Sequence, residues 1–596
     1  ALNANTTANN NTAVGKDALY VNTTGHNNTA VGTASLDANL TGIENVALGS
    51  SSLSGNTTGS ENVAVGQGAL FANTTASYNT AVGKSALVTN TTGASNTALG
   101  TDALQANTTA SENTAVGYQA GYTNTTGTKN VAVGAYSLGD NTTGDNNVAV
   151  GRQALKYNTT ANNNTAVGYQ SLQVNTTGDT NVAVGKDSML ANTTGTNNTA
   201  VGARSLQSNT TAANNVAVGD LALGANTTGH GNIGIGVSAL TANTTGISNV
   251  AVGYLAADAQ AGNANYNVAI GAEALSTNTL GSQNVAIGRS ALLAFNVTSA
   301  AATYNTAVGD QAGGSVTTGT KNTFVGAQAG DANTTASDNS AFGYASLGAN
   351  TTGTGNNAFG IQSLDANTTG NYNTAFGHVA MTTNITGTDN TGFGSQVLYS
   401  VTGSSNTALG SAAGYAISSG SNNLVLGRDA GRTGSPGGNF TTVSNVMCLG
   451  DENMSACNIQ TDWTVASDQR DKTDFTALDL GLDFVKALAP VTYKWDKRSK
   501  YGNKKADDYD LLDQTPDGTH KEDWLDIGFK AQEVEALEIA AGYNKSNKTN
   551  LTTSLTGDGK QYGIQYSKFV PILVKALQEL SAKNDALEAR ITTLEG

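Results

Sequence analysis

A serine and a lysine five residues apart stand at the sharpest change of composition in this chain. The run Ser467-Asp-Gln-Arg-Asp-Lys472 follows a long repetitive sequence and precedes a charged, mixed one. A serine hydroxyl is a weak nucleophile that needs a base, and a lysine can act as that base when partial burial lowers its pKa. Ser467 and Lys472 are therefore the candidate nucleophile and general base.

The composition narrows the classes of function. The chain has 596 residues, of which 71 are Gly and 12% are charged, and its net charge is -15. This acidic balance argues against nucleic acid and anionic membrane surfaces as partners. No apolar run approaches the roughly 20 residues of a membrane helix, so we expect no membrane insertion. The chain begins at Ala1 inside a repeat without a visible signal peptide, so we expect N-terminal processing or an upstream anchor.

Neither histidine nor cysteine points to a bound metal or cofactor. The four His residues are scattered along the chain and none has ligand-like company, so we predict no metal and no cofactor. Cys448 and Cys457 lie nine residues apart, just before the serine and lysine. They fit either a local disulfide or two small buried apolar side chains.

A short repeat with a regular period occupies the first three quarters of the chain. A Gly that ends an Ala-Val-Gly-like triplet recurs 26 times, first at Gly15 and last at Gly450. The spacing of these glycines gives a period of about 17 residues. In each unit the triplet predicts a short strand, with Thr12 and Val14 on one face and Ala13 on the other. Gly15 is expected in a turn that a side chain would forbid, and the Asn-Thr-Thr-Gly that follows is a second turn.

A unit of this length cannot bury its apolar face alone, but stacked units can. The repeat therefore predicts a mainly β fold, a long parallel β-solenoid or β-roll of about 26 units over residues 1–450. Val184, one of the Val14-like residues, is expected in the stacked core, where a Val184→Asp change would bury a charge. The repeat resembles the heads of trimeric autotransporter adhesins and the shafts of phage and marine-virus fibres, which implies three chains.

The repeated turn also carries formal acceptors for N-linked glycans. Asn-Thr-Thr occurs 17 times, mostly in register. Two interpretations stay open: a row of exposed glycosylation sites, as in a eukaryotic or giant-virus setting, or turn residues that stack well, as in a bacterial one. The first six acceptors in the array that keep this triplet are Asn5, Asn22, Asn56, Asn73, Asn90 and Asn107.

After residue 466 the sequence predicts a small α+β region. Pro490 ends an amphipathic helix, and a period-2 alternation marks the strand after it. The predicted elements are a helix over 479–489, a strand over 491–495, an irregular insertion over 497–522, a strand entering a helix over 527–534, a polar loop over 545–560, a strand over 562–566 and a helix from 567 to the end.

The final helix carries a heptad pattern over residues 572–596. Leu573, Leu580, Leu587 and Leu594 fit d positions, and Leu577, Asn584 and Ile591 fit a positions. This pattern predicts a short parallel coiled coil, with Asn584 setting register and chain number. The alternative is a single helix packed on its own domain.

Four motifs of this region together resemble one family. They are Ser467-Asp-x-Arg-x-Lys472, Leu488-Ala-Pro-Val-x-Tyr-x-Trp495, Gly528-Phe-Lys-Ala-Gln-Glu-Val534 and Tyr566-x-x-Phe-Val-Pro-Ile-Leu573. They are similar to the C-terminal intramolecular chaperone of endosialidase-type tailspikes and tail fibres, a self-cleaving serine peptidase. The resemblance implies a homotrimer that aligns three fibre chains and cuts itself off at the Ala466–Ser467 bond.

The resemblance also assigns roles to the junction residues. It implies Ser467 as nucleophile, Lys472 as general base, and Asp468 and Arg470 as residues that hold the loop by ion pairing. The expected organisation is a shaft over 1–450, a neck over 451–466 and a chaperone and autopeptidase over 467–596. The enzyme would be a single-turnover serine endopeptidase, and a chaperone that has lost cleavage is the alternative.

Two classes of function remain from the sequence. The first is a viral tail or virion fibre that contacts a host-cell surface receptor or glycan from the virion surface. The second is an extracellular fibril or adhesin on a bacterial cell with the same chaperone, with or without cleavage. A glycan-cleaving enzyme is disfavoured, because the repeat offers no paired carboxylates near aromatic platforms.

Overall fold

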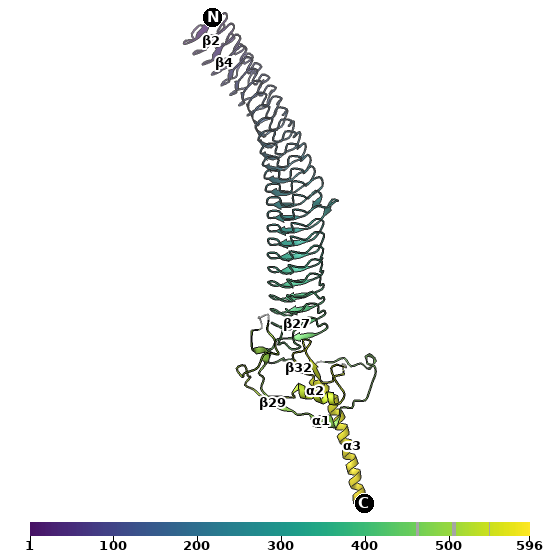
Figure 1. Ribbon diagram of the computed structural model, residues 1–596. Helices are drawn as coiled ribbons and strands as arrows, with labels where there is room; N and C mark the ends of the chain where they lie inside the picture. The colour runs from purple at the N-terminus through teal and green to yellow at the C-terminus, as the bar shows by residue number, and fades with distance from the viewer. Residues whose placement is uncertain (461–463, 504–507, 547–548) are drawn as a thin grey trace. The chain divides into compact units, whose positions relative to one another are not determined.

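The computed structural model of the chain describes residues 1–460, 464–503, 508–546 and 549–596. It divides into two compact units, Ala1–Asn339 and Ser340–Gly596. Figure 1 shows short strands stacked in successive coils throughout the first unit and at the start of the second. Residues 461–463 of the predicted neck, 504–507 of the predicted insertion and 547–548 of the predicted loop lie outside the described residues.

The first unit is a parallel β-solenoid. Each of its three-residue strands pairs with the next coil, so Thr12 lies beside Thr29 and Ala13 beside Ala30. The strands are β1 (Thr12–Val14), β2 (Thr29–Val31), β3 (Val46–Leu48), β4 (Val63–Val65), β5 (Thr80–Val82), β6 (Thr97–Leu99), β7 (Thr114–Val116), β8 (Val131–Val133), β9 (Val148–Val150), β10 (Thr165–Val167), β11 (Val182–Val184), β12 (Thr199–Val201), β13 (Val216–Val218), β14 (Ile233–Ile235), β15 (Val250–Val252), β16 (Val268–Ile270), β18 (Val285–Ile287), β20 (Thr306–Val308) and β21 (Thr323–Val325).

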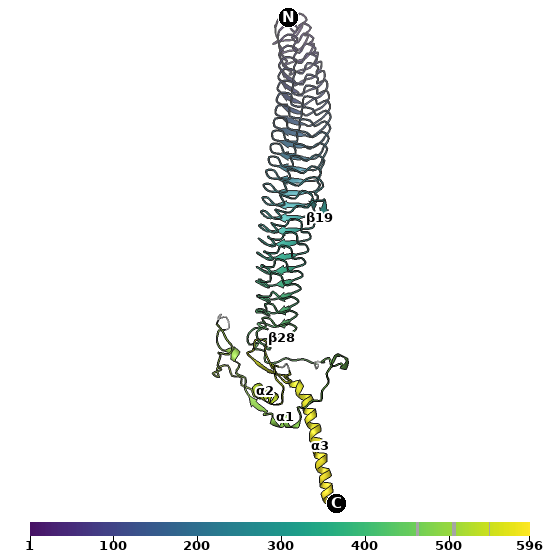
Figure 2. The same cartoon turned by 45° about the vertical axis from the view of Figure 1, so that its right-hand side comes forward.

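An insertion interrupts the regular spacing of the strands in this unit. The pairing of β18 with β20 joins Val285 to Thr306, a longer step along the chain than that from Val268 to Val285 in the coil before it. The additional residues include β19 (Ala301–Ala302), which pairs in parallel with β17 (Gly281–Ser282). In Figure 2, β19 projects from the side of the coils, so the insertion is accommodated outside the stack.

The strands turn their small residue inward, which corrects the expected position of the valines. Ala183 is fully buried, whereas Val182 and Val184 on either side of it are only half-buried. The same pattern holds in most coils, because the leucines of the turn already fill much of the interior and leave room for a small inward residue; Phe324 and Val425 are larger inward residues. The prediction that Val184 lies in the core is therefore wrong, and the Thr and Val side chains form the outer face of the sheet.

Leucines from the turn fill the rest of the interior. Ala18 and Leu19 are fully buried, as expected for a second apolar contact. Leu19 takes a positive φ of 49°, and Asp17 one of 59°. A left-handed conformation costs about 1 kcal/mol or more at a residue other than Gly. Complete burial of a leucine side chain contributes about 2 kcal/mol, which offsets the cost of the left-handed conformation at Leu19.

The glycine after each strand is required by both conformation and space. Gly185 has a φ of 134°, and a Cβ there would lie 2.4 Å from the carbonyl oxygen of Gly202 in the next coil. This confirms the predicted turn. The repeated Gly is therefore a point at which successive backbones approach closely.

Asparagines at two positions of each coil form buried ladders. Asn90 Nδ2 donates to Asn73 Oδ1 of the preceding coil at 3.0 Å and to the Gly93 carbonyl at 2.9 Å. A second row works similarly, with the Asn28 amide donating to Asn11 Oδ1 at 2.9 Å. These bonds satisfy polar groups that would otherwise be costly in the interior.

The ladders bear on the predicted glycan acceptors. Asn5, in the first coil, is exposed. The others of the six are fully buried, namely Asn22, Asn56, Asn73, Asn90 and Asn107. A glycan on Nδ2 would remove one of its two hydrogens and needs space that a stacked coil does not offer. We therefore expect these five sites to carry no glycan in the folded shaft.

The second unit continues the coils and then changes to α+β. Its parallel strands are β22 (Ser340–Phe342), β23 (Asn357–Phe359), β24 (Thr374–Phe376), β25 (Thr391–Phe393), β26 (Thr407–Leu409), β27 (Leu424–Leu426) and β28 (Met447–Leu449). The α+β region contains the 3-10 turn η1 (Gln469–Asp471), α1 (Leu482–Ala487), β29 (Val491–Tyr493), η2 (Arg498–Lys500), β30 (Asp526–Gly528), α2 (Ala531–Ala540), β31 (Thr553–Leu555), β32 (Tyr562–Ile564), η3 (Tyr566–Lys568) and α3 (Phe569–Glu595).

Most elements predicted after residue 466 are present. The helix before Pro490, the strand after it and the last helix are confirmed, with shorter bounds for the first two. The polar loop over 545–560 is wrong in part, because β31 forms there and pairs antiparallel with β32. A strand this short and polar forms because a partner strand is beside it, which its own sequence does not reveal.

A small core joins the helices of this region. Leu480, Phe484, Val534, Phe569 and Ile572 are buried together. Along the rest of α3 the heptad leucines are exposed to solvent: Leu577 is 68% exposed and Leu594 is 81% exposed. The described part of a single chain therefore does not cover the a and d positions of this helix.

The inward Ala gives a direct test of this fold. Ala183→Asp places a carboxylate inside the coil stack without a partner and is expected to lower the free energy of unfolding of the shaft by about 3 kcal/mol or more. Thermal unfolding followed by circular dichroism measures this change. Thr194→Asp, at an exposed position of the next coil, is the matched control and should leave the transition unchanged. Equal melting of the two variants would contradict the inward Ala.

Candidate functional site

Ser467 and Lys472 lie side by side after the last coil. The 3-10 turn η1 reverses the chain between them and brings Lys472 Nζ to 2.5 Å from Ser467 Oγ. The same nitrogen lies 3.4 Å from the Ser467 carbonyl oxygen. A base in hydrogen-bond reach of a hydroxyl is the arrangement that activates a serine nucleophile. The structure thus brings together the two residues that the sequence predicts.

Asp468 and Arg470 fix the turn that holds this pair. Asp468 caps η1 by accepting the Arg470 amide at 2.9 Å, and the two side chains form an ion pair of 2.6 Å. The bonds from Arg470 lower the pKa of Asp468, and the same side-chain bond raises the pKa of Arg470. The ion pair is therefore present above the ordinary Asp pKa and is lost only as pH falls through the lowered value.

The site is open to water in the single chain. Ala466, Ser467 and Lys472 are exposed, and the neighbouring Val465 is 80% exposed. Phe475, which follows the turn, is 67% exposed. A hydrolytic site gains from the exclusion of bulk water, which strengthens every electrostatic contact inside it. We call Ser467 and Lys472 the dyad. The apolar residues next to the dyad are thus available to be covered by another surface.

Two glutamates that the sequence analysis missed hold the α+β region together. Glu579 on α3 accepts the Leu482 amide at the start of α1 at 2.7 Å, and this bond lowers the pKa of the Glu579 carboxyl. Glu538 on α2 is buried and accepts the Leu551 amide at 3.2 Å and the Thr552 hydroxyl at 2.8 Å. A buried carboxylate is tolerated only with such a set of donors. No local pattern signals either contact, because the partners are far apart in sequence.

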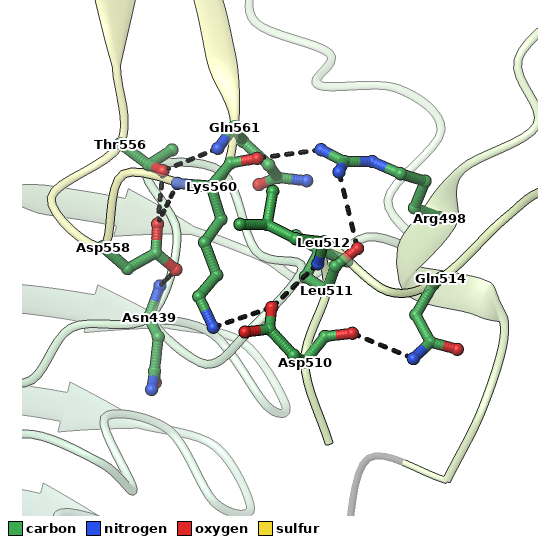
Figure 3. Close-up of polar contacts among 10 residues, drawn as sticks. All are labelled: Asn439, Arg498, Asp510, Leu511, Leu512, Gln514, Thr556, Asp558, Lys560 and Gln561. Carbon is green, nitrogen blue, oxygen red and sulfur yellow. Dashed lines mark hydrogen bonds and ion pairs between the residues drawn. The ribbon is translucent and has the colours of Figure 1, made fainter. Parts of the chain in front are cut away.

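The last coil is joined to the α+β region by the tip of the β31–β32 hairpin. Asp558 Oδ2 accepts the Asn439 amide of that coil at 2.9 Å (Figure 3). Asp558 Oδ1 is in turn bonded by the Thr556 hydroxyl and by the Lys560 amide. A Cβ at Gly438 would lie 2.7 Å from Asp558 Oδ1, so the side chain of Asp558 packs directly against the backbone of the last coil.

A second set of polar contacts fastens the hairpin to the η2 segment. Arg498 Nη2 donates to the Lys560 carbonyl at 2.8 Å, and Lys560 Nζ forms a 3.0 Å ion pair with Asp510 (Figure 3). Lys497 Nζ donates to the Glu452 carbonyl beyond the last strand at 2.9 Å. The contact between Lys497 and Glu452 spans the Ala466–Ser467 bond, because Glu452 precedes that bond and Lys497 follows it.

Other candidate sites receive little support. Among the described residues, no group of three or more His, Cys, Asp or Glu side chains is placed to hold a metal ion. Cys448 is buried and Cys457 is exposed, and both are free thiols, so the structure has no disulfide between them. Within the described ranges, no helix has the length and apolarity needed to cross a bilayer.

Comparison with known families identifies the C-terminal region. Residues 467–543 match the family model described as chaperone of endosialidase. The match begins at Ser467, lies after the β-solenoid and includes three of the four motifs, which confirms the resemblance for these three; the motif Tyr566-x-x-Phe-Val-Pro-Ile-Leu573 lies beyond it. The chain is thus a β-solenoid followed by a C-terminal region that is similar to the chaperone of endosialidase. Neither the curated proteins nor the solved structures contain a significant match to the chain.

The contact between the hairpin tip and the last coil can be tested at one side chain. Asp558→Ala removes the acceptor of the Asn439 amide, and a hydrogen bond to a charged group contributes about 1.5–3 kcal/mol. We expect this amide to exchange with deuterium about tenfold faster or more, measured by hydrogen–deuterium exchange mass spectrometry. Asp513→Ala, at an exposed carboxylate of the same region, is the control. Unchanged protection of Asn439 would show that the contact carries no stability.

Proposed function

We propose that this chain is a viral tail or virion fibre that attaches to a host cell and is matured by its own chaperone. The chaperone aligns three chains and then releases itself by cutting the Ala466–Ser467 bond. The observation that supports this proposal most directly is the contact of Lys472 Nζ with Ser467 Oγ at 2.5 Å, at the residue where the family match begins. The proposed location of the fibre is the virion surface.

The chemistry is an intramolecular acyl transfer. Lys472 in its neutral form takes the proton of Ser467 Oγ, and the oxygen attacks the Ala466 carbonyl carbon. The amide nitrogen of Ser467 leaves with a proton, so the shaft becomes an ester on the Ser467 hydroxyl. Water then hydrolyses the ester and frees the shaft carboxylate and the serine hydroxyl. Holding the reacting groups in one chain supplies much of the rate.

Assembly of three chains rests on two apolar surfaces of the single chain. The outer face of the solenoid carries a continuous row of Val, Leu, Ile and Phe side chains, of which Val201 is 37% and Leu409 is 55% exposed. The heptad positions of α3 are the second surface. Contiguous apolar patches of this kind mark interfaces, and a heptad pattern marks a coiled coil.

The exposed dyad makes cleavage dependent on assembly. In the single chain Ser467 and Lys472 are exposed to water. The neighbouring side chains Val465 and Phe475 are exposed as well. Packing of three chains covers these side chains, excludes water and favours the neutral lysine that the reaction requires. Loss of the chaperone then leaves a trimeric shaft that is kinetically hard to unfold.

An alternative is favoured by the strand motif of the repeat, which resembles that of adhesin heads. In this alternative the same architecture forms an extracellular fibril on a bacterial cell. Immunogold labelling of virions and of uninfected cells with an antibody to the shaft separates the two.

The catalytic assignment is tested by replacing each member of the dyad. Ser467→Ala and Lys472→Ala are each expected to leave an uncut chain of 60.1 kDa that still forms trimers. The wild type should yield a shaft ending at Ala466 and a released fragment that begins at Ser467 and ends at Gly596, by intact-mass measurement. A wild-type chain that trimerises but stays whole, or a Lys472→Ala chain cut at the wild-type rate, would remove the peptidase and leave the chaperone.

The trimer interface is tested on the outer face of the sheet. Val184→Asp puts a charge on the half-buried face, so the coil should fold while association is lost, because an unpaired carboxylate would be buried between chains. Light scattering at micromolar concentration is expected to give a trimer for the wild type and for Thr194→Asp, and a monomer for Val184→Asp. A monomeric wild type would exclude the trimer.

A further inference from the structure

The tyrosines of the first unit are concentrated in one stretch of the shaft. Five of the ten tyrosines in residues 1–339 fall between positions 118 and 169. They are Tyr118, Tyr122, Tyr136, Tyr157 and Tyr169. The repeat needs no tyrosine for its strands or its core, so this concentration has no role in the coil itself.

The in-register stack places these tyrosines on one face. Four of the five follow the turn Gly by one, two or six positions, in the coils that begin at Gly117, Gly134, Gly151 and Gly168. Equivalent positions of successive coils lie directly beside one another in a parallel solenoid. We call the surface formed by Tyr118, Tyr136, Arg152, Gln153, Lys156, Tyr157, Tyr169, Gln170 and Gln173 the tyrosine face.

Ring contacts connect the coils of the tyrosine face. Tyr118 and Tyr136 meet edge to face with centroids 5.3 Å apart. Lys156 Nζ lies 5.9 Å from the Tyr136 centroid and 4.3 Å from that of Tyr157, and it bonds the Tyr157 hydroxyl at 2.9 Å. The guanidinium of Arg152 lies 5.9 Å from the Tyr169 centroid. These contacts hold rings and cations in place while leaving them open to water.

Amide side chains lie among the rings. Gln170 Nε2 donates to Gln153 Oε1 at 3.2 Å, and Gln173 Nε2 donates to the same oxygen at 3.3 Å. Gln170 Nε2 also lies 3.4 Å from Gln173 Oε1. Each of these side chains is half-buried and retains part of its donor and acceptor capacity.

The cations of the tyrosine face lack acidic partners within the described residues. Arg152 and Lys156 form no ion pair there, whereas Lys186 pairs with Asp187 at 3.6 Å and Arg204 with Asp220 at 3.0 Å in the coils beyond. The same turn rows carry charged side chains in many coils, so this side of the shaft stays in water. Asp140 and Asp187 lie at the two edges of the face, where their amides bond the carbonyls of Lys156 and Tyr169, but neither forms an ion pair with Arg152 or Lys156. These two unpaired cations are the groups available to an anionic ligand.

The chemistry of the face distinguishes a sugar from a protein partner. Between Gly117 and Val174, the large hydrophobic side chains that are exposed are Tyr118, Tyr157 and Tyr169, with no exposed aliphatic residue among these described positions. Tyr and Arg side chains are also common at protein interfaces, so a sugar is favoured by the glutamine amides among the rings and by the lack of an exposed aliphatic side chain at these described positions. Tyrosine rings with flat apolar faces and polar tips, mixed with amides, suit a ring that is apolar on one face and bears hydroxyls at its edge.

We propose that the tyrosine face binds an acidic oligosaccharide along the shaft. The tyrosine rings contact the sugar rings, the glutamine amides bond hydroxyls, and Arg152 and Lys156 pair with carboxylate or sulfate groups. Three coil-to-coil steps of about 4.8 Å span about 14 Å, which is long enough for several linked sugars and not for one. This inference rests on the attachment role proposed above and names the class of receptor for it.

The experiment uses the full chain and three defined probes. A hyaluronan hexasaccharide carries carboxylates, a heparin hexasaccharide adds sulfates, and maltohexaose is neutral. Calorimetry is expected to show binding of an acidic probe and at least tenfold weaker binding of maltohexaose. The double variant Arg152→Gln with Lys156→Gln should weaken acidic-probe binding about tenfold or more, because it removes two charge-assisted contacts. Tyr157→Ala should weaken it as well.

A matched variant and an assembly readout make the outcome clear. Lys84→Gln removes a positive charge from the row of Arg152, one position after its turn Gly and outside the tyrosine face, and should bind as the wild type does. Binding of the heparin probe alone supports the site and identifies sulfate as its target. Equal binding of neutral and acidic probes, no binding of any probe, or full binding by the double variant overturns the inference. Light scattering on the same samples reports the trimer, so failure here is separate from failure of assembly.

Discussion

Each coil of the shaft depends on its neighbours for the hydrogen bonds of its backbone, and this dependence governs the rest of the structure. Each strand residue pairs with its equivalent in the next coil, as Thr12 does with Thr29. Each side chain must therefore be able to pack beside the equivalent side chain of the neighbouring coil. Ala tolerates this inside the coil, Asn does so by bonding the next Asn, and Gly185 and its equivalents do so where the backbones nearly touch. The same rule leaves the last coil without a further coil to pair with, and it leaves one apolar outer face that the described part of a single chain does not cover.

The last coil shows how this end is managed. The hairpin tip at Asp558 bonds the coil backbone at Asn439, and Arg498 and Lys560 connect that tip to the η2 segment. The end of the stack is therefore capped by polar groups of the α+β region, as repeat proteins require at their termini. The capping contacts lie on both sides of the Ala466–Ser467 bond, so the shaft end and the chaperone touch independently of the peptide that links them.

The dyad is exposed to solvent, in contrast to the buried core of the α+β region. Ser467 and Lys472 are held by a short turn and one ion pair, whereas the helices nearby share a buried core and two well-bonded glutamates. Geometry for proton transfer is thus present before assembly, while the dry surroundings that would make it effective are not. In the proposed mechanism this difference would make packing of the chains precede cleavage.

The sequence by itself determined the period, the strand at Thr12–Val14, the need for Gly15, the elements around Pro490 and the pairing of Ser467 with Lys472. Each of these follows from local residue chemistry or from spacing within a few residues. Only the tertiary structure decided which face of the strand turns inward, because a three-residue strand offers two faces and the interior that the turn leucines share leaves most coils room for a small inward residue. It also decided that Asn22 and its equivalents are buried, that β31 forms, and that Glu538 and Glu579 join distant segments. The tyrosine face likewise exists only because stacking in register makes neighbours of residues one full repeat apart.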